Sequence, residues 1–163
     1  LFNIRYTSYK AYIGTKVLVT AVSGGCCVIC AFCLQTIFCI FAAFSSGEFF
    51  GEFMGYVGQH MLLSLLQWAG LAALSGAFWA VIGGISAVVM KSRYMAYMAP
   101  FILYYILSEF QSRYYPELHF LSPKEWVVSK YLSVGVRYGA LIIAVCLASG
   151  VYSAVIRRRV AHV

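Results

Sequence analysis

Long stretches without any charged residue dominate the chain and predict membrane-spanning helices. The first stretch covers residues 17–47 and the last covers residues 138–156. A bilayer core about 30 Å thick requires about 20 helical residues. We therefore expect one span at about 17–44 and another at about 132–156.

The charge-free stretch 53–90 is too long for one minimal span and barely long enough for two. A hairpin turn would fall most naturally at Ser75-Gly76, but it would reset the helical phase on its two sides. Small and bulky residues instead keep to two opposite stripes across this point, which indicates one helix at about 61–90 preceded by a short interfacial helix at 47–58. The small stripe is Ala69, Ala72, Ala73, Gly76, Ala80, Gly84 and Ala87, and the bulky stripe is Leu71, Leu74, Phe78, Ile82, Ile85 and Val89.

A tight basic loop at 91–93 leads into a third apolar segment, about 94–111, which Pro100 is expected to kink. The segment 112–131 is polar and reads as a second interfacial excursion, and 157–163 is a basic tail. The predicted fold is therefore an all-α integral membrane protein with four spans and short interfacial helices in one transmembrane domain, residues 1–163.

The composition supports this class and excludes others. Hydrophobic residues make up 63% of the 163 residues, charged residues make up 10%, and the mean hydropathy is +0.84. Soluble domains carry about a quarter charged residues. A soluble enzyme, a nucleic-acid-binding module and a disordered chain are therefore all excluded as first interpretations.

The net charge of +7 is divided unevenly between the two sides that the four spans define. The positive-inside rule places the more basic side in the cytoplasm, so we expect a multi-pass protein of the cell membrane with both ends of this sequence cytoplasmic. Nucleic acid is not an expected partner, because a phosphate-binding face needs many clustered cations. One side receives Arg5, Lys10, Lys16, Lys91, Arg93, Arg157, Arg158 and Arg159, and the other receives Arg113, Lys124, Lys130, Arg137 and all five acids.

Five of the six cysteines fall inside the first span. Cys27, Cys30 and Cys33 have the local spacing of iron–sulfur ligands. A cluster is wrapped by a loop, however, whereas this segment is an apolar helix without nearby bases to form thiolates. Packing as small apolar residues is the preferred interpretation, and a redox or metal role is the alternative.

The sequence offers little conventional catalytic chemistry. It has no phosphate-binding G-x-x-x-x-G-K-[ST] loop and no serine nucleophile elbow, and its three histidines are too far apart to suggest a shared metal site. We expect no catalytic, cofactor or metal residues in this chain. The candidates that remain are four polar residues inside spans, which either bond neighbouring helices or line a pathway, and one ion pair at the outer ends of two spans. The polar residues are Gln35, Thr36, Ser64 and Gln67, and the pair is Glu109 with Arg137.

Glycines spaced four apart predict close contact between helix backbones, within the chain or with a second copy. They occur at Gly47, Gly51 and Gly55 and again at Gly135 and Gly139.

The layout resembles the C-terminal four spans of a type-2 ATP-binding-cassette (ABC) exporter permease. A polar, basic segment at 1–16 runs directly into a long span, a tight basic turn follows the return span, and a polar excursion precedes the last span and its basic tail. The resemblance implies a permease subunit that pairs with a second copy or a homologue and exports an amphipathic or apolar cargo, such as a peptide antibiotic, a lipid or a drug. A separate P-loop ATPase would hold ATP and Mg²⁺. It also implies that Tyr6, Tyr9, Lys10 and Lys16 couple the spans to that ATPase, and that short extracellular helices lie within 112–131. The first two spans of the family have no counterpart in residues 1–163.

Two other functions stay open at this level. A four-span thiol oxidoreductase would use the cysteine cluster, although redox pairs need access to water or quinone near the end of a span. A structural subunit of a larger membrane complex would need none of these features.

Overall fold

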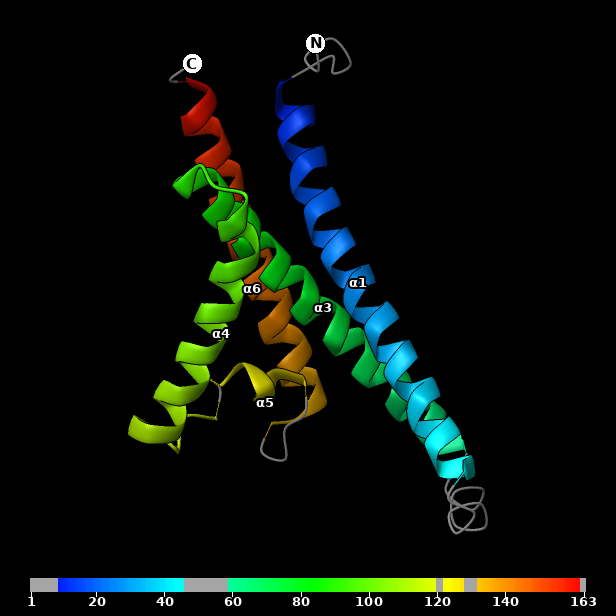
Figure 1. Cartoon of the computed structure of the whole chain (residues 1–163). Helices are drawn as coiled ribbons and strands as arrows, with labels where there is room; N and C mark the ends of the chain where they lie inside the picture. The colour runs from blue at the N-terminus through cyan, green and yellow to red at the C-terminus, as the bar shows by residue number, and fades with distance from the viewer. Residues whose placement is uncertain (1–8, 46–58, 120–121, 128–131, 162–163) are drawn as a thin grey trace.

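The computed structural model describes residues 9–45, 59–119, 122–127 and 132–161. Within these ranges the chain is helical and contains no strand (Figure 1). The expected interfacial helix at 47–58 lies outside the described residues. The helices are α1 (Tyr9–Ser45), α3 (Gln59–Met90), α4 (Tyr94–Tyr114), α5 (Pro123–Val127) and α6 (Val134–Ala161).

Three of the described helices, α1, α3 and α6, are long and apolar enough to cross a membrane. The predicted segment 94–111 also forms a helix, but its composition does not place it with these three. The reason is its polar second half, which carries Glu109, Gln111 and Arg113. The all-helical architecture is thus confirmed for the described residues, and three of its helices have the length and composition of membrane spans.

Two of the helices extend well beyond the predicted spans. α1 begins at Tyr9 instead of residue 17, and α6 continues through the three arginines to Ala161 instead of stopping at residue 156. Nothing in residues 9–16 breaks a helix, and the Thr15 hydroxyl donates to the Ala11 carbonyl within it at 2.8 Å. Charged residues mark where a span leaves the apolar layer, whereas a helix ends only where its backbone hydrogen bonds end.

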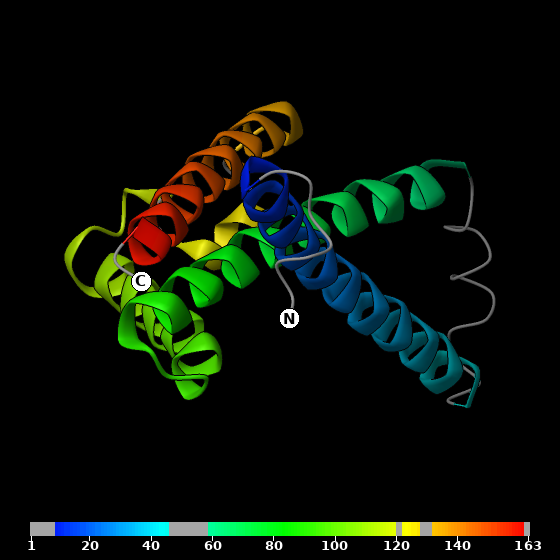
Figure 2. The same cartoon turned by 90° about the horizontal axis from the view of Figure 1, so that it is seen from above.

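Helix α3 is the centre of the bundle and is unbroken at Ser75-Gly76, as the two stripes predict. It packs against α1, α4, α5 and α6 (Figures 1 and 2). The bulky stripe contributes Phe78, Ile82 and Ile85 to the core that α3 shares with α1 and α6.

The small stripe allows α1 to approach α3 closely. A methyl group added at Gly24 would lie 2.7 Å from the Gly76 carbonyl oxygen, and one added at Gly25 would lie 3.2 Å from the Ala73 carbonyl oxygen. In a membrane, where lipid competes equally for apolar surface, contact between small residues is a principal source of helix association.

Helix α6 packs against α3 through two tyrosines, each of which lies over a glycine. Tyr138 covers Gly70 and donates from its hydroxyl to the Gln67 carbonyl at 2.8 Å. Tyr152 is buried against Gly84, fourteen residues further along α3. The separation from Tyr138 to Tyr152 is also fourteen residues, so the two helices run parallel in matched register.

Pro100 interrupts the hydrogen-bond ladder of α4, because proline cannot donate to the carbonyl four residues earlier. That carbonyl belongs to Ala96, and it lies directly against Gly83 of α3. Pro100 itself also contacts this point, 3.2 Å from a methyl group built on Gly83. The proline that weakens α4 internally thus coincides with the place where α4 joins α3.

Candidate functional site

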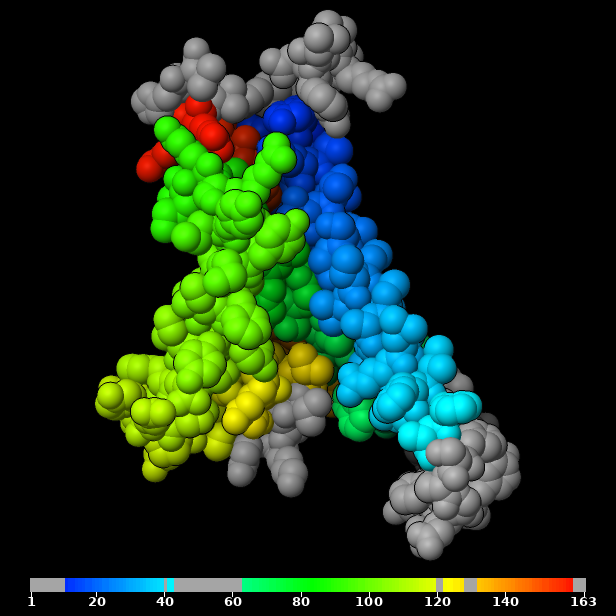
Figure 3. Space-filling view, viewed as in Figure 1, coloured from blue at the N-terminus to red at the C-terminus, as the bar shows by residue number. Residues whose placement is uncertain are grey.

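A groove of about 660 Å³ lies between α1 and α4, with α3 as its floor. Figure 3 shows it as a hollow between the blue α1 and the yellow-green α4, with the darker green α3 behind. Glycine and alanine line much of the floor, so the space exists because side chains are absent there. The small lining residues are Gly24, Ala72, Gly76, Ala80, Gly83, Gly84 and Ala96.

The lining is polar in places but carries no charged residue. The Thr20 hydroxyl donates to the Lys16 carbonyl at 2.8 Å, and the Ser23 hydroxyl donates to the Thr20 carbonyl at 3.0 Å. Both hydroxyl protons are therefore used inside α1, and the oxygens remain as weak acceptors toward the groove. Such a surface accepts hydrocarbon with little penalty and offers a charged group no partner. Its polar and aromatic lining residues are Thr20, Ser23, Ser75, Trp79, Tyr97 and Tyr152.

The short helix α5 closes the end of the groove that lies away from the chain termini. Val127 lines the groove, and the preceding residue, Trp126, stacks on Trp79 of α3 with ring centres 6.0 Å apart. Phe78 meets Trp126 edge-on at 5.5 Å, and Tyr104 of α4 meets Trp79 at 5.8 Å. Aromatic pairs at these separations contribute about 0.5–1.5 kcal/mol each beyond burial, so this cluster holds α5 against the bundle.

The predicted ion pair between Glu109 and Arg137 is not what the structure contains. Glu109 pairs with Arg113 one turn along α4 at 3.0 Å, with the Arg113 side chain 73% exposed and the Glu109 side chain 42% exposed. Arg137 is only 7% exposed and donates from Nη1 to the Val127 carbonyl at 2.7 Å. Glu109 finds a nearer partner in Arg113, one turn away on its own helix. Arg137 instead bonds the Val127 carbonyl at the end of α5.

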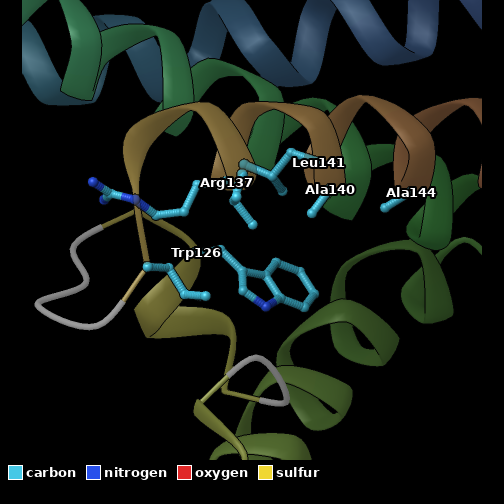
Figure 4. A pocket seen from close by; sticks show the side chains of 7 residues that line it. Trp126, Arg137, Ala140, Leu141 and Ala144 are labelled. Atoms are coloured by element: carbon cyan, nitrogen blue, oxygen red, sulfur yellow. The ribbon is translucent and has the colours of Figure 1, made fainter.

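Arg137 therefore fastens α5 to α6. Figure 4 shows the Trp126 ring beneath Ala140 and Leu141 of α6, while the Arg137 side chain extends in the other direction. A cavity of about 30 Å³, lined by both Trp126 and Arg137, is about the size of one water molecule. The Nε atom of Arg137 and the Nε1 atom of Trp79 are buried without a hydrogen-bond partner among the described residues.

None of the four predicted pathway residues lines this groove. Thr36 lines a second, apolar hollow of about 370 Å³ between α1 and α3, and its hydroxyl donates to the Phe32 carbonyl at 2.8 Å. Gln35 is exposed, and Ser64 and Gln67 lie near the start of α3, where Gln67 contributes only its carbonyl to the contact with Tyr138.

The predicted coupling residues lie at the beginning of α1 or before it. Tyr6 is outside the described residues, as are the side chains of Tyr9 and Lys10, whose backbones form the first turn of α1. Lys16 is exposed, and its ammonium group lies 5.8 Å from the centre of the Tyr12 ring.

The cysteines do not pack inside the bundle. All six are exposed and unbridged, five along α1 and one on α6. Within the described part of the chain, no three histidine, cysteine or acidic side chains gather as a metal site would require.

Sequence reasoning missed the hydroxyl groups that line the groove. Thr20, Ser23 and Ser75 were not singled out, because isolated hydroxyls inside spans are common and usually bond their own helix. The short helices that the family resemblance implies within 112–131 include α5 (Pro123–Val127). Its start could also have been located from the sequence, since Ser122-Pro123-Lys124-Glu125 combines the S-x-x-E capping pattern with proline at the first helical position. In the structure the Glu125 amide donates to the Ser122 carbonyl at 3.0 Å.

Comparisons of the chain with protein-family models, with curated proteins and with solved structures gave no match.

Proposed function

We propose that this protein is the transmembrane permease subunit of an ABC transporter that exports an amphipathic or apolar cargo, powered by a separate ATPase subunit. The observation that carries the proposal is the uncharged groove between α1, α3 and α4. Its volume of about 660 Å³ is within the range of small-molecule sites. Because it lies between helices, a cargo dissolved in the bilayer would reach it without crossing a charged surface.

The proposal includes α4 as a fourth span. It lies alongside α3 and carries the chain back from the end where the termini lie to the opposite end (Figure 1). Its two charged residues, Glu109 and Arg113, neutralise each other near its far end. Four spans would place both termini on one side, and the excess of basic residues there favours the cytoplasm of a cell-membrane protein.

The beginning of α1 supports a mechanical connection to an ATPase. Tyr9–Lys16 continue without a break into the part of α1 that lines the groove at Thr20 and Gly24. A push on this end of α1 would therefore reach the groove through one rigid helix. ATP and Mg²⁺ would be bound by the partner, and a second permease copy or a homologue would complete the transporter.

The decisive experiment is affinity purification of the tagged protein in mild detergent, with mass spectrometry of the proteins that accompany it. The proposal expects a stoichiometric P-loop ATPase whose ATP turnover rises when the permease is present. A matched purification of a Lys10→Glu, Lys16→Glu variant should lose that ATPase, whereas Lys124→Glu on α5 should retain it. A wild-type preparation that neither carries nor stimulates a P-loop ATPase would refute the proposal.

A further inference from the structure

The groove has one basic end, and its lining residues show which end that is. The first half of α1, the end of α3 and the start of α4 lie nearer the chain termini (Figure 1), and they contribute Thr20, Gly84 and Ala96 to the groove. Lys16 lies one turn of α1 beyond Thr20, and the Thr20 hydroxyl is bonded to its carbonyl. Arg93 lies one turn before Ala96 at the start of α4, where its carbonyl accepts from the Ala96 amide at 3.2 Å.

Both cations are exposed, and nothing acidic stands near this end on the described helices. α1, α3 and α6 contain no acidic residue. The acids that the structure describes, Glu109, Glu117 and Glu125, belong to the second half of α4 and to the segment that follows it, at the opposite end. The ammonium group of Lys16 lies 5.8 Å from the centre of the Tyr12 ring, and a ring face leaves an ammonium group able to bind an anion.

The remainder of the groove is suited to hydrocarbon. Its floor of glycine and alanine is uncharged, and α5 closes the far end with Val127 beside the stacked Trp79. A molecule that fits must therefore be negative at one end and apolar along its length. Basic pockets between helices on the cytoplasmic side of a membrane bind anionic lipid headgroups for the same reason.

We propose that the groove binds a membrane phospholipid with an anionic headgroup, its phosphate between Lys16 and Arg93 and an acyl chain along α3 as far as Val127. The inference rests on the proposed function in one respect only, namely that the bound lipid is also transported. The binding itself is a property of this chain alone, so it is tested without an ATPase.

The test uses Trp79 as the reporter. Trp68→Phe and Trp126→Phe leave Trp79, which lines the groove, as the single tryptophan. The purified protein is titrated in mixed micelles with phosphatidylglycerol brominated on its acyl chains, and separately with phosphatidylcholine carrying the same chains. Bromine quenches indole fluorescence on contact.

Phosphatidylglycerol should quench Trp79 at a lower mole fraction than phosphatidylcholine. Each cation near an anionic headgroup is worth about fivefold in binding. Lys16→Gln and Arg93→Gln should each reduce the preference by about fivefold, and Lys124→Gln at the opposite end should leave it unchanged.

A second, independent test fills the groove with a larger side chain. Ser23 lines the groove and is exposed, so Ser23→Phe adds bulk there without disturbing the core, whereas its neighbour Val22 is exposed outside the lining. Ser23→Phe should remove the quenching, and Val22→Phe should preserve it.

Equal quenching by the two lipids, or equal quenching of Ser23→Phe and Val22→Phe, would overturn the inference. Either result leaves the outcome of the ATPase purification unaffected. Conversely, selective quenching in a protein that carries no ATPase would support the lipid site while refuting the transporter.

Discussion

The contact between α1 and α3 makes a quantitative prediction at Gly76. A methyl group added there would lie 2.5 Å from Val28 Cγ2, 2.9 Å from Val28 Cβ and 2.8 Å from the Gly24 carbonyl oxygen. Carbon atoms meet comfortably at about 3.5–4.0 Å. Gly76→Ala therefore forces α1 to withdraw by about 1 Å along its main contact with the bundle.

Two effects of opposite sign determine how much Gly76→Ala changes the free energy of unfolding. Overpacking a well-filled contact costs about 1–3 kcal/mol, whereas alanine is better than glycine inside a helix by about 0.8–1.0 kcal/mol. A substitution at Gly150 of α6 isolates the second effect, because nothing lies within 4 Å of a methyl group there. The free energies of unfolding of Gly76→Ala and Gly150→Ala should differ by about 1–3 kcal/mol, with Gly150→Ala at or above the wild-type value.

The assay is reversible unfolding in detergent, followed by circular dichroism, with size-exclusion profiles to verify the folded state. Val28→Ala should partly rescue Gly76→Ala, because it removes the nearest atom but leaves the Gly24 carbonyl in place. The double-mutant cycle should give a coupling of at least about 0.5 kcal/mol. Equal stability of Gly76→Ala and Gly150→Ala would refute the idea that the small stripe sets the approach of the two helices.

Three further changes have expected outcomes. Tyr138→Phe removes the hydroxyl that donates to the Gln67 carbonyl and should lower the free energy of unfolding by about 1 kcal/mol in the same assay. A loss above about 3 kcal/mol would contradict this reasoning, because it would mean that the packing of the ring had been disturbed. Arg137→Gln removes the bond to the Val127 carbonyl, and since bonds to charged groups are worth about 1.5–3 kcal/mol, amide hydrogen exchange in α5 should accelerate about tenfold or more, with unchanged exchange contradicting the anchoring role. Simultaneous replacement of all six cysteines by alanine should alter lipid quenching of Trp79 and stability little, because all six are exposed. A large loss of either would contradict the interpretation that these side chains lie outside the groove and the core. The cysteines are Cys26, Cys27, Cys30, Cys33, Cys39 and Cys146.

The class of protein and the existence of its long helices follow from the pattern of charged and apolar residues alone. Charge-free runs longer than a bilayer is thick admit few other structures, since backbone groups in lipid must be satisfied within a helix. The two stripes along α3 likewise predicted one unbroken helix through Ser75-Gly76. Charged residues, however, mark the boundary of the apolar layer and not the end of a helix. For that reason α1 begins before its predicted span, at Tyr9, and α6 ends after its predicted span, at Ala161.

Which polar residues contact one another depends instead on how the helices pack. Glu109 and Arg137 both occur near the outer ends of predicted spans, but whether they touch depends on helix rotation and on the path of α5, and neither is encoded locally. The groove depends in the same way on three helices converging at glycines and alanines, so that its lining at Thr20, Ser75 and Tyr97 comes from positions far apart in the chain. A pattern along one helix specifies which faces can pack closely, and the shape left between helices is fixed only when all of them have packed.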